Sequence, residues 1–172
     1  MSRPFNNPVT LLRNHDFRGL WFAGGCFWTT RWIEILAVSV FVFDFTGSAA
    51  MVALMVFART VPMVLFGAVV GALAQYVQGR TLLLFGLAAL SVMSAVLGLL
   101  VASGAIEVWH IALGAFLSGT YGTMEFTVRR IMLGEIVGTE RAGSALALDA
   151  VTMNGTKILG PVVGGILYEL IG

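Results

Sequence analysis

Apolar residues occur along this chain in five long runs, and most polar and charged residues lie between the runs. The runs cover residues 19–43, 49–75, 81–103, 108–128 and 143–171. A helix needs about 20 apolar residues to cross a hydrocarbon core of about 30 Å, and each run is long enough. The pattern therefore predicts an all-α membrane protein, a polytopic bundle of five transmembrane helices that follows a tail at residues 1–18.

Basic residues predict the orientation of this bundle. The tail and the loops at residues 76–80 and 129–142 hold seven of them, whereas the loops at residues 44–48 and 104–107 hold none. The seven are Arg3, Arg13, Arg18, Arg80, Arg129, Arg130 and Arg141. Because basic loops stay in the cytoplasm, we expect a multi-pass protein of the cytoplasmic (inner) membrane with its N-terminus in the cytoplasm.

Composition agrees with a membrane location. Hydrophobic residues make up 58% of the chain and charged residues 11%, which argues against a soluble domain. The lipid bilayer is thus the first expected partner. A formal net charge of +1 gives no reason to expect nucleic acid.

Several polar residues nevertheless lie inside the predicted spans. A charge facing lipid at the bilayer centre costs about 2.5–3.5 kcal/mol on the insertion scale, so such residues are expected to face the bundle interior or a watery cavity. They are the candidate transport and coupling residues: Arg31, Glu34, Arg59, Asp149, Asn154 and Lys157. A purely structural role stays open, since Arg31 and Glu34 share a helix face and Glu125 is a possible partner for Arg59.

Small residues mark where helices approach closely. The fifth span holds Gly160, Pro161, Gly164 and Gly165, a motif that suits either a helix that bends or a static kink. We expect Gly160 and Gly164 to pack against the second span, where Gly67 and Gly71 offer a matching small surface. The fourth span has a second stripe of small residues at Gly114, Ser118 and Gly122. The third span has no charge and is expected to face lipid or support the others.

Nothing in the sequence indicates an enzyme. The chain has no His-Glu-x-x-His motif, and its two histidines, His15 and His110, cannot build a metal site by themselves. We therefore expect no catalytic residue, metal or cofactor.

Four stretches resemble one known family in their order and position. They are Leu12-Arg-Asn-His-Asp-Phe-Arg-Gly-Leu-Trp21, Thr46-Gly-Ser48, Arg59-Thr-Val-Pro62 and Asn154-Gly-Thr-Lys-Ile-Leu-Gly-Pro-Val-Val-Gly-Gly165. Together they resemble the major facilitator superfamily, in the exporter branch that includes the enterobactin exporter and the transmembrane secretion effectors. The resemblance implies a twelve-helix fold of two six-helix halves, of which this chain supplies five helices of the first. It also implies secondary-active efflux of a small molecule by alternating access, coupled to protons.

The chain departs from this family in two ways. The signature loop after the second helix normally reads Gly-x-Leu-Ala-Asp-Arg-x-Gly-Arg-Arg, and here it runs from Gly71 to Arg80 with Gln75 at the acidic position. The sixth helix and the second half are also missing, so the substrate cavity needs either that half or self-association. The alternative hypothesis is therefore a truncated, non-transporting membrane fragment or helix-association partner.

Overall fold

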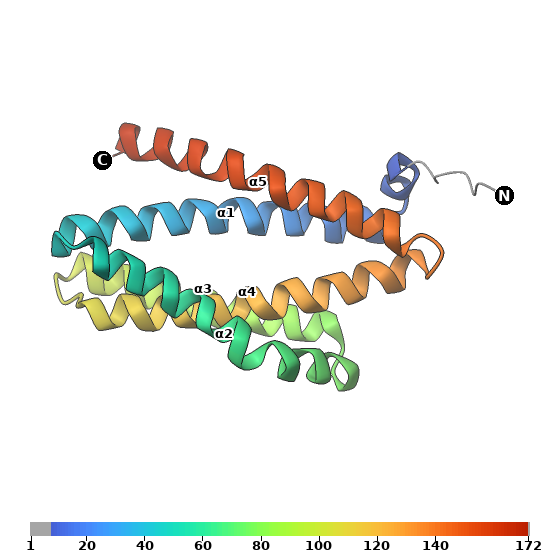
Figure 1. Cartoon of the computed structure of the whole chain (residues 1–172), viewed down its shortest axis with the longest axis horizontal. Coiled ribbons are helices and arrows are strands. Elements are labelled where there is room, and N and C mark those ends of the chain that lie inside the picture. The colour runs from blue at the N-terminus through green and yellow to red at the C-terminus, as the bar shows by residue number, and fades with distance from the viewer. Residues whose placement is uncertain (1–7, 172) are drawn as a thin grey trace. The chain divides into compact units, whose positions relative to one another are not determined.

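The structure, a computed structural model that describes residues 8–171, confirms the all-α fold and its five long helices. A short 3₁₀ helix, η1 (Pro8–Arg13), precedes α1 (His15–Thr46), α2 (Ala49–Tyr76), α3 (Gly79–Ala102), α4 (Val108–Val137) and α5 (Ala142–Ile171) (Figure 1). No strand occurs among the described residues. Residues 1–7 of the predicted tail, with Arg3, lie outside them.

Local signals in the sequence set the helix ends. The Asn14 side chain accepts hydrogen bonds from the backbone N–H groups of Asp16 and Phe17, at 3.0 and 3.2 Å, and so caps the start of α1. Gly47 and Gly138 follow α1 and α4 with φ values of 64° and 77°, a left-handed conformation that glycine adopts without steric cost. The connections between the helices are consequently short.

The first three long helices have the clearest membrane character. Among the described residues, His15–Thr46, Ala49–Leu73 and Gly79–Ala102 are long and apolar enough to cross a membrane. The helices α4 and α5 are not in this set, and their charged residues include Arg129, Arg130 and Asp149. That α4 and α5 also cross the bilayer over residues 108–128 and 143–171 stays a prediction.

The helices form two compact units, and α1 and α4 contribute to both. One unit consists of the described parts of Met1–Ala37 and Arg129–Gly172, and the other is Val38–Val128. We call them the terminal unit and the central unit. Each has its own apolar core.

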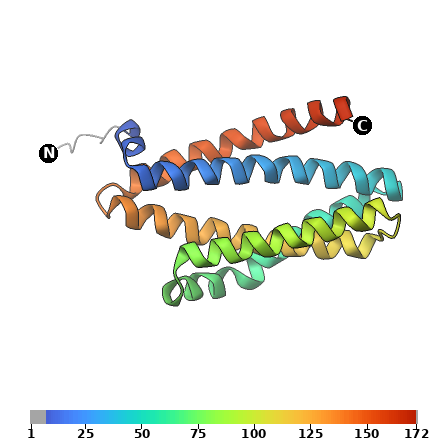
Figure 2. The same ribbon diagram turned by 180° about the vertical axis from the view of Figure 1, so that it is seen from behind.

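In the terminal unit, α5 lies beside the first part of α1 and runs in the same direction (Figure 2). At the start of both helices, buried Phe17 and Ala145 pack with Leu11 of η1 and Leu133 near the end of α4. The 3₁₀ helix thus closes one end of this unit.

Gly160 and Gly164 let α5 approach α1 closely, so the helix that packs on these glycines is α1 and not the expected α2. A Cβ added at Gly160 would collide with Trp32, and one added at Gly164 would lie 3.0 Å from Leu36 Cδ2. Gly67 and Gly71 on α2 have nothing within 4 Å of an added Cβ, and neither has Gly165. The prediction of α2 as the partner was wrong because the spacing of small residues shows that a helix is approached, but not by which neighbour.

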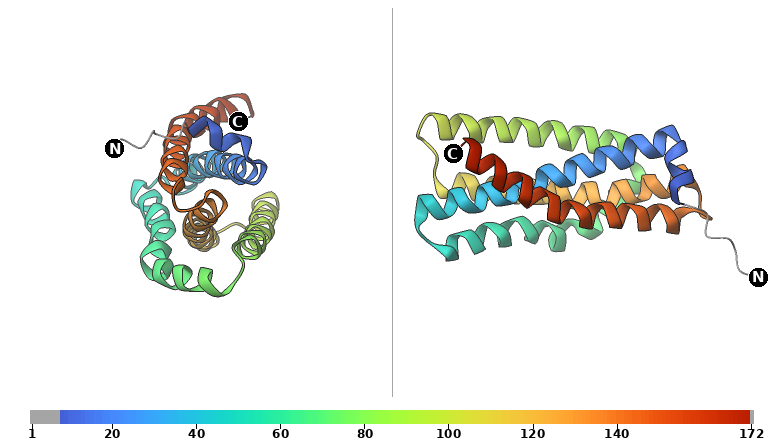
Figure 3. Two further views of the ribbon diagram at one scale, coloured as in Figure 1. Left: turned by 90° about the vertical axis from the view of Figure 1, so that its right-hand side faces the viewer. Right: turned by 90° about the horizontal axis from the view of Figure 1, so that it is seen from above.

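In the central unit, α4 lies between α2 and α3 (Figure 3). A Cβ added at Gly119 would collide with the backbone carbonyl of Arg59 on α2, and one added at Gly114 would lie 2.6 Å from Leu97 Cδ1 on α3. The contact at Gly114 agrees with the packing role expected for the stripe of small residues in the fourth span, and Gly119, which is outside that stripe, makes a second close contact. Val42, Met55, Ile106 and Ile111 form the core, so the turn after α1 and the loop after α3 lie at the same end of this unit.

The helix α3 buries none of its residues, although it packs against α4. It has no charged residue after Arg80, and this and its exposure agree with the expectation that it faces lipid or supports the other helices.

The close contact of α5 with α1 predicts a difference between two neighbouring substitutions. In Gly164→Leu, the new side chain would meet Leu36 and the backbone of Ile33, which lies 3.5 Å from an added Cβ. We expect this overpacking to lower the free energy of unfolding by about 1–3 kcal/mol. Val163 is 40% exposed, so Val163→Leu should change it by less than about 0.5 kcal/mol. Thermal unfolding in detergent, followed by circular dichroism, measures both; equal effects would contradict the α1–α5 contact.

Candidate functional site

A buried ion pair joins two helices of the terminal unit. Arg129 near the end of α4 donates from Nη1 to Oδ1 of Asp149 on α5, and each side chain is only 2% exposed. Asp149 is one of the predicted candidates and is now paired. Since both charges are buried, water does not solvate either of them, and each charge is stabilised by the other.

Arg129 was expected in a loop, and this was wrong. The helix α4 continues through Arg129 and Arg130 to Val137, because the apolar residues Ile131, Met132 and Leu133 follow. The helix ends where Gly138 adopts a left-handed conformation. Arg129 and Arg130, two of the seven basic residues, therefore leave the loop count used to predict orientation. The difference in basic residues between the two sets of loops remains, since the loops at residues 44–48 and 104–107 hold none.

Gly24 on α1 makes room for the guanidinium. A Cβ added at this buried glycine would lie 2.6 Å from Arg129 Nη1 and 2.7 Å from Cζ. Real Cβ atoms do not approach so closely, so any larger residue would displace the arginine. Three helices therefore build the site: α4 provides the cation, α5 the carboxylate and α1 the space.

The second carboxylate oxygen of Asp149 is not used by the protein. Oδ2 is buried and has no hydrogen-bond partner among the described residues. An unsatisfied buried acceptor costs about 1–3 kcal/mol, more when it is charged. Such an atom is a natural place for a proton or a ligand N–H to bind.

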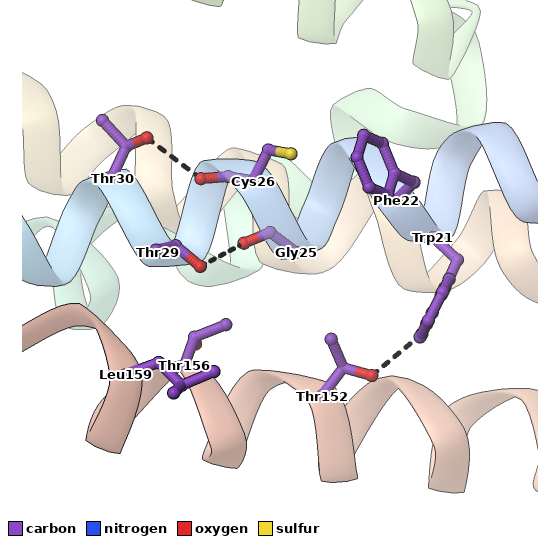
Figure 4. A pocket seen from close by; sticks show the side chains of 9 residues that line it. All are labelled: Trp21, Phe22, Gly25, Cys26, Thr29, Thr30, Thr152, Thr156 and Leu159. Carbon is purple, nitrogen blue, oxygen red and sulfur yellow. Dashed lines mark hydrogen bonds between the residues drawn. The ribbon is translucent and has the colours of Figure 1, made fainter. Parts of the chain in front are cut away.

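A groove of about 460 Å³ runs between α1 and α5. Its lining residues are Trp21, Phe22, Gly25, Cys26, Thr29, Thr30, Thr152, Thr156 and Leu159 (Figure 4). Trp21 Nε1 donates to Thr152 Oγ1 at 3.0 Å, which ties the two helices together at one end of the groove. Thr152 lies one helical turn after Asp149, so the groove and the ion pair share a region of α5.

The other predicted candidates on α5 are not in this site. Asn154 and Lys157 are exposed on the described chain, and Asn154 Nδ2 donates to the backbone carbonyl of Ala150 at 2.8 Å. The structure thus brings Asp149 together with Arg129 and not with Lys157.

The candidates on the other helices are divided between the two units. Arg31 is buried and Glu34 half-buried on α1 in the terminal unit. Arg59 on α2 and Glu125 on α4 are both buried in the central unit, at 8% and 3% exposure. Gln75 and Arg80 of the signature loop are exposed at the end of α2 and the start of α3.

Sequence reasoning missed four residues of the site: Arg129, Gly24, Trp21 and Thr152. A signal for Arg129 was present, since Ile131, Met132 and Leu133 continue the apolar pattern beyond it. The other three lie within apolar runs, where nothing in the sequence distinguishes them from their neighbours.

Long apolar helices that bury an ion pair and flank a groove of ligand size are typical of helical membrane transporters. Residues 6–172 match the transmembrane secretion effector family. The chain belongs to this family of major facilitator transporters, which confirms the resemblance and indicates a function in membrane transport. Neither a curated protein nor a solved structure gives a significant match to the chain.

The ion pair predicts strongly non-additive mutant stabilities. Arg129→Met or Asp149→Leu alone should lower the free energy of unfolding by about 3–5 kcal/mol, because each removes one partner of a buried ion pair. The double variant leaves no charge and should recover most of the loss. Chemical denaturation in detergent, followed by tryptophan fluorescence, gives the coupling energy; additive losses would show that the two side chains do not stabilise each other.

Proposed function

We propose that this chain forms part of a secondary-active exporter that moves a small molecule by alternating access and couples this movement to protons. The observation that carries the proposal is the buried pair of Arg129 and Asp149, with an unsatisfied carboxylate oxygen on a helix that lines a groove of ligand size. By the family's architecture, the chain contributes helices one to five of a twelve-helix protein and works with a second half.

Asp149 is the proposed proton carrier. In its ionised form it neutralises Arg129 and holds α5 to the end of α4. Protonation would remove that attraction and leave the arginine as a buried cation, a state that favours movement of the two helix segments apart. The charged group that faces Asp149 from α4 is Arg129, and α1 faces the pair with Gly24, which has no side chain.

The contact of α5 with α1 supports such a movement. Pro161 cannot donate a hydrogen bond to the carbonyl of Lys157, so the helix is weaker there, between the two glycines that touch α1. Small residues on both sides of a weak point allow one helix to rock on another without losing large side-chain contacts. We therefore propose that Gly160, Pro161 and Gly164 allow α5 to rock on α1.

We also propose that the protein lies in the cytoplasmic membrane with its N-terminus in the cytoplasm. The turn after α1 and the loop after α3 share one end of the central unit and hold no basic residue, which supports an outside location for both.

Cysteine labelling tests this orientation. In a Cys26→Ala background, we expect a membrane-impermeant maleimide to label Ala49→Cys in intact cells, because this exposed residue follows the outer turn. Tyr76→Cys at the opposite end of α2 is 87% exposed and should be labelled only after permeabilisation. The reverse result would overturn the orientation.

Reconstitution tests transport. Liposomes that hold the chain alone, with an imposed pH gradient and ethidium as probe, should show no gradient-driven accumulation, because alternating access needs two bundles that move about a shared site. Liposomes that also hold the C-terminal half of a full-length family member should accumulate ethidium.

The variants in this assay test the role of Asp149 in coupling. Asp149→Asn should abolish accumulation by the combined halves, whereas Asn154→Ala on the same helix should preserve it, since Asn154 is exposed. Equal transport by Asp149→Asn would contradict a role in coupling. Transport by the chain alone would instead mean that several copies assemble a pathway, and the absence of any transport from both preparations would favour the non-transporting alternative.

A further inference from the structure

The groove between α1 and α5 offers hydrogen-bond acceptors and almost no donors. Its four threonine hydroxyls each donate to a backbone carbonyl of their own helix. Thr29 donates to Gly25 at 2.8 Å and Thr30 to Cys26 at 3.0 Å on α1. On α5, Thr152 donates to Leu148 at 3.0 Å and Thr156 to Met153 at 2.7 Å.

Each of these hydroxyl oxygens keeps lone pairs after donating its proton. Thr152 uses one of them to accept from Trp21 Nε1, the only side-chain N–H in the groove, so that donor is also occupied. A ligand in the groove therefore meets oxygen atoms that accept hydrogen bonds, and it finds no uncommitted N–H or O–H.

The remaining lining is apolar and aromatic. The side chains of Trp21 and Phe22 stand at one end of the groove and Leu159 at the other (Figure 4). Aromatic faces attract cations within about 6 Å, and no charged side chain lines the groove. The volume of about 460 Å³ suits one drug-sized molecule.

We propose that this groove binds an amphiphilic ammonium ion, a protonated amine carried on a planar apolar body. The N–H groups would donate to the threonine oxygens, and the body would pack on Trp21 and Phe22. An anion of the same shape is disfavoured because the groove has no donor to receive it. This inference deepens the proposed function and rests on it, since it assigns the substrate class of the exporter.

Cys26 provides a direct readout of binding. It is the only cysteine of the chain, it is exposed, and it lines the groove. A bound ligand should therefore slow its alkylation by N-ethylmaleimide. The assay uses the full chain in nanodiscs of zwitterionic lipid, so that anionic headgroups do not attract cations, and follows modification by mass spectrometry without any pH gradient.

Three naphthyl compounds separate charge from donor capacity. We expect 1-naphthylmethylammonium to protect Cys26 at a concentration about tenfold lower than its trimethylammonium analogue, which has the charge but no N–H. The anion 1-naphthylacetate should give no protection. Equal or better protection by the anion would overturn the proposal.

Two threonine variants test the acceptors themselves. Thr29→Val and Thr156→Val keep the shape and remove one oxygen each, so each should weaken protection by the ammonium compound about tenfold and leave protection by the trimethylammonium compound unchanged. Thr60→Val is the matched control, because Thr60 donates to its own helix in the same way but lies on α2 outside the groove. Unchanged protection in both groove variants would also overturn the proposal.

The Cys26 protection assay needs no pH gradient, so it tests the substrate class separately from the exporter function. Protection by the ammonium compound without gradient-driven transport would leave the binding site standing and refute the exporter. Gradient-driven transport with protection only by the anion would leave the exporter standing and refute the substrate class.

Discussion

The terminal unit depends on the cost of holding charge away from water. Arg129 and Asp149 are each only 2% exposed, and either charge alone would be far more costly than the two together. This constraint explains the neighbouring residues. Position 24 is a glycine because the guanidinium occupies the space that a side chain would take. The last part of α4 lies against α5 because the charges of Arg129 and Asp149 have to pair.

Close packing in the two units depends on glycines as well as on the apolar cores. Between helices in lipid there is no hydrophobic driving force, so contact distance and complementary shape have to provide the attraction. Glycines supply this at Gly160 and Gly164 against α1, and at Gly114 and Gly119 against α3 and α2. The same residue type thus organises both units, while large apolar side chains such as Phe57, Val64 and Leu99 remain exposed.

The sequence predicted the helices well because each is decided by local signals: apolar length, the Asn14 cap and the left-handed glycines. It predicted that Asp149 would face the bundle interior or a watery cavity, since a charge exposed to lipid is too costly. It did not predict Arg129 as the partner of Asp149, because that choice depends on how far α4 extends and on which residues tertiary packing brings together. For the same reason it identified Gly160 and Gly164 as contact points but assigned them to the wrong helix.

The exposure of α3 has a consequence for how this protein can vary. Since none of its residues is buried, most of its side chains have only to dissolve in lipid. Many different apolar sequences satisfy that requirement equally well, so α3 is free to drift in evolution while its length is kept. The exceptions are the few positions that touch α4, such as Gly86, which leaves room for Tyr121 and Met124, and Leu97, which rests on Gly114. Among distant relatives, α3 should therefore be recognisable by its hydropathy and these few contacts rather than by its residues.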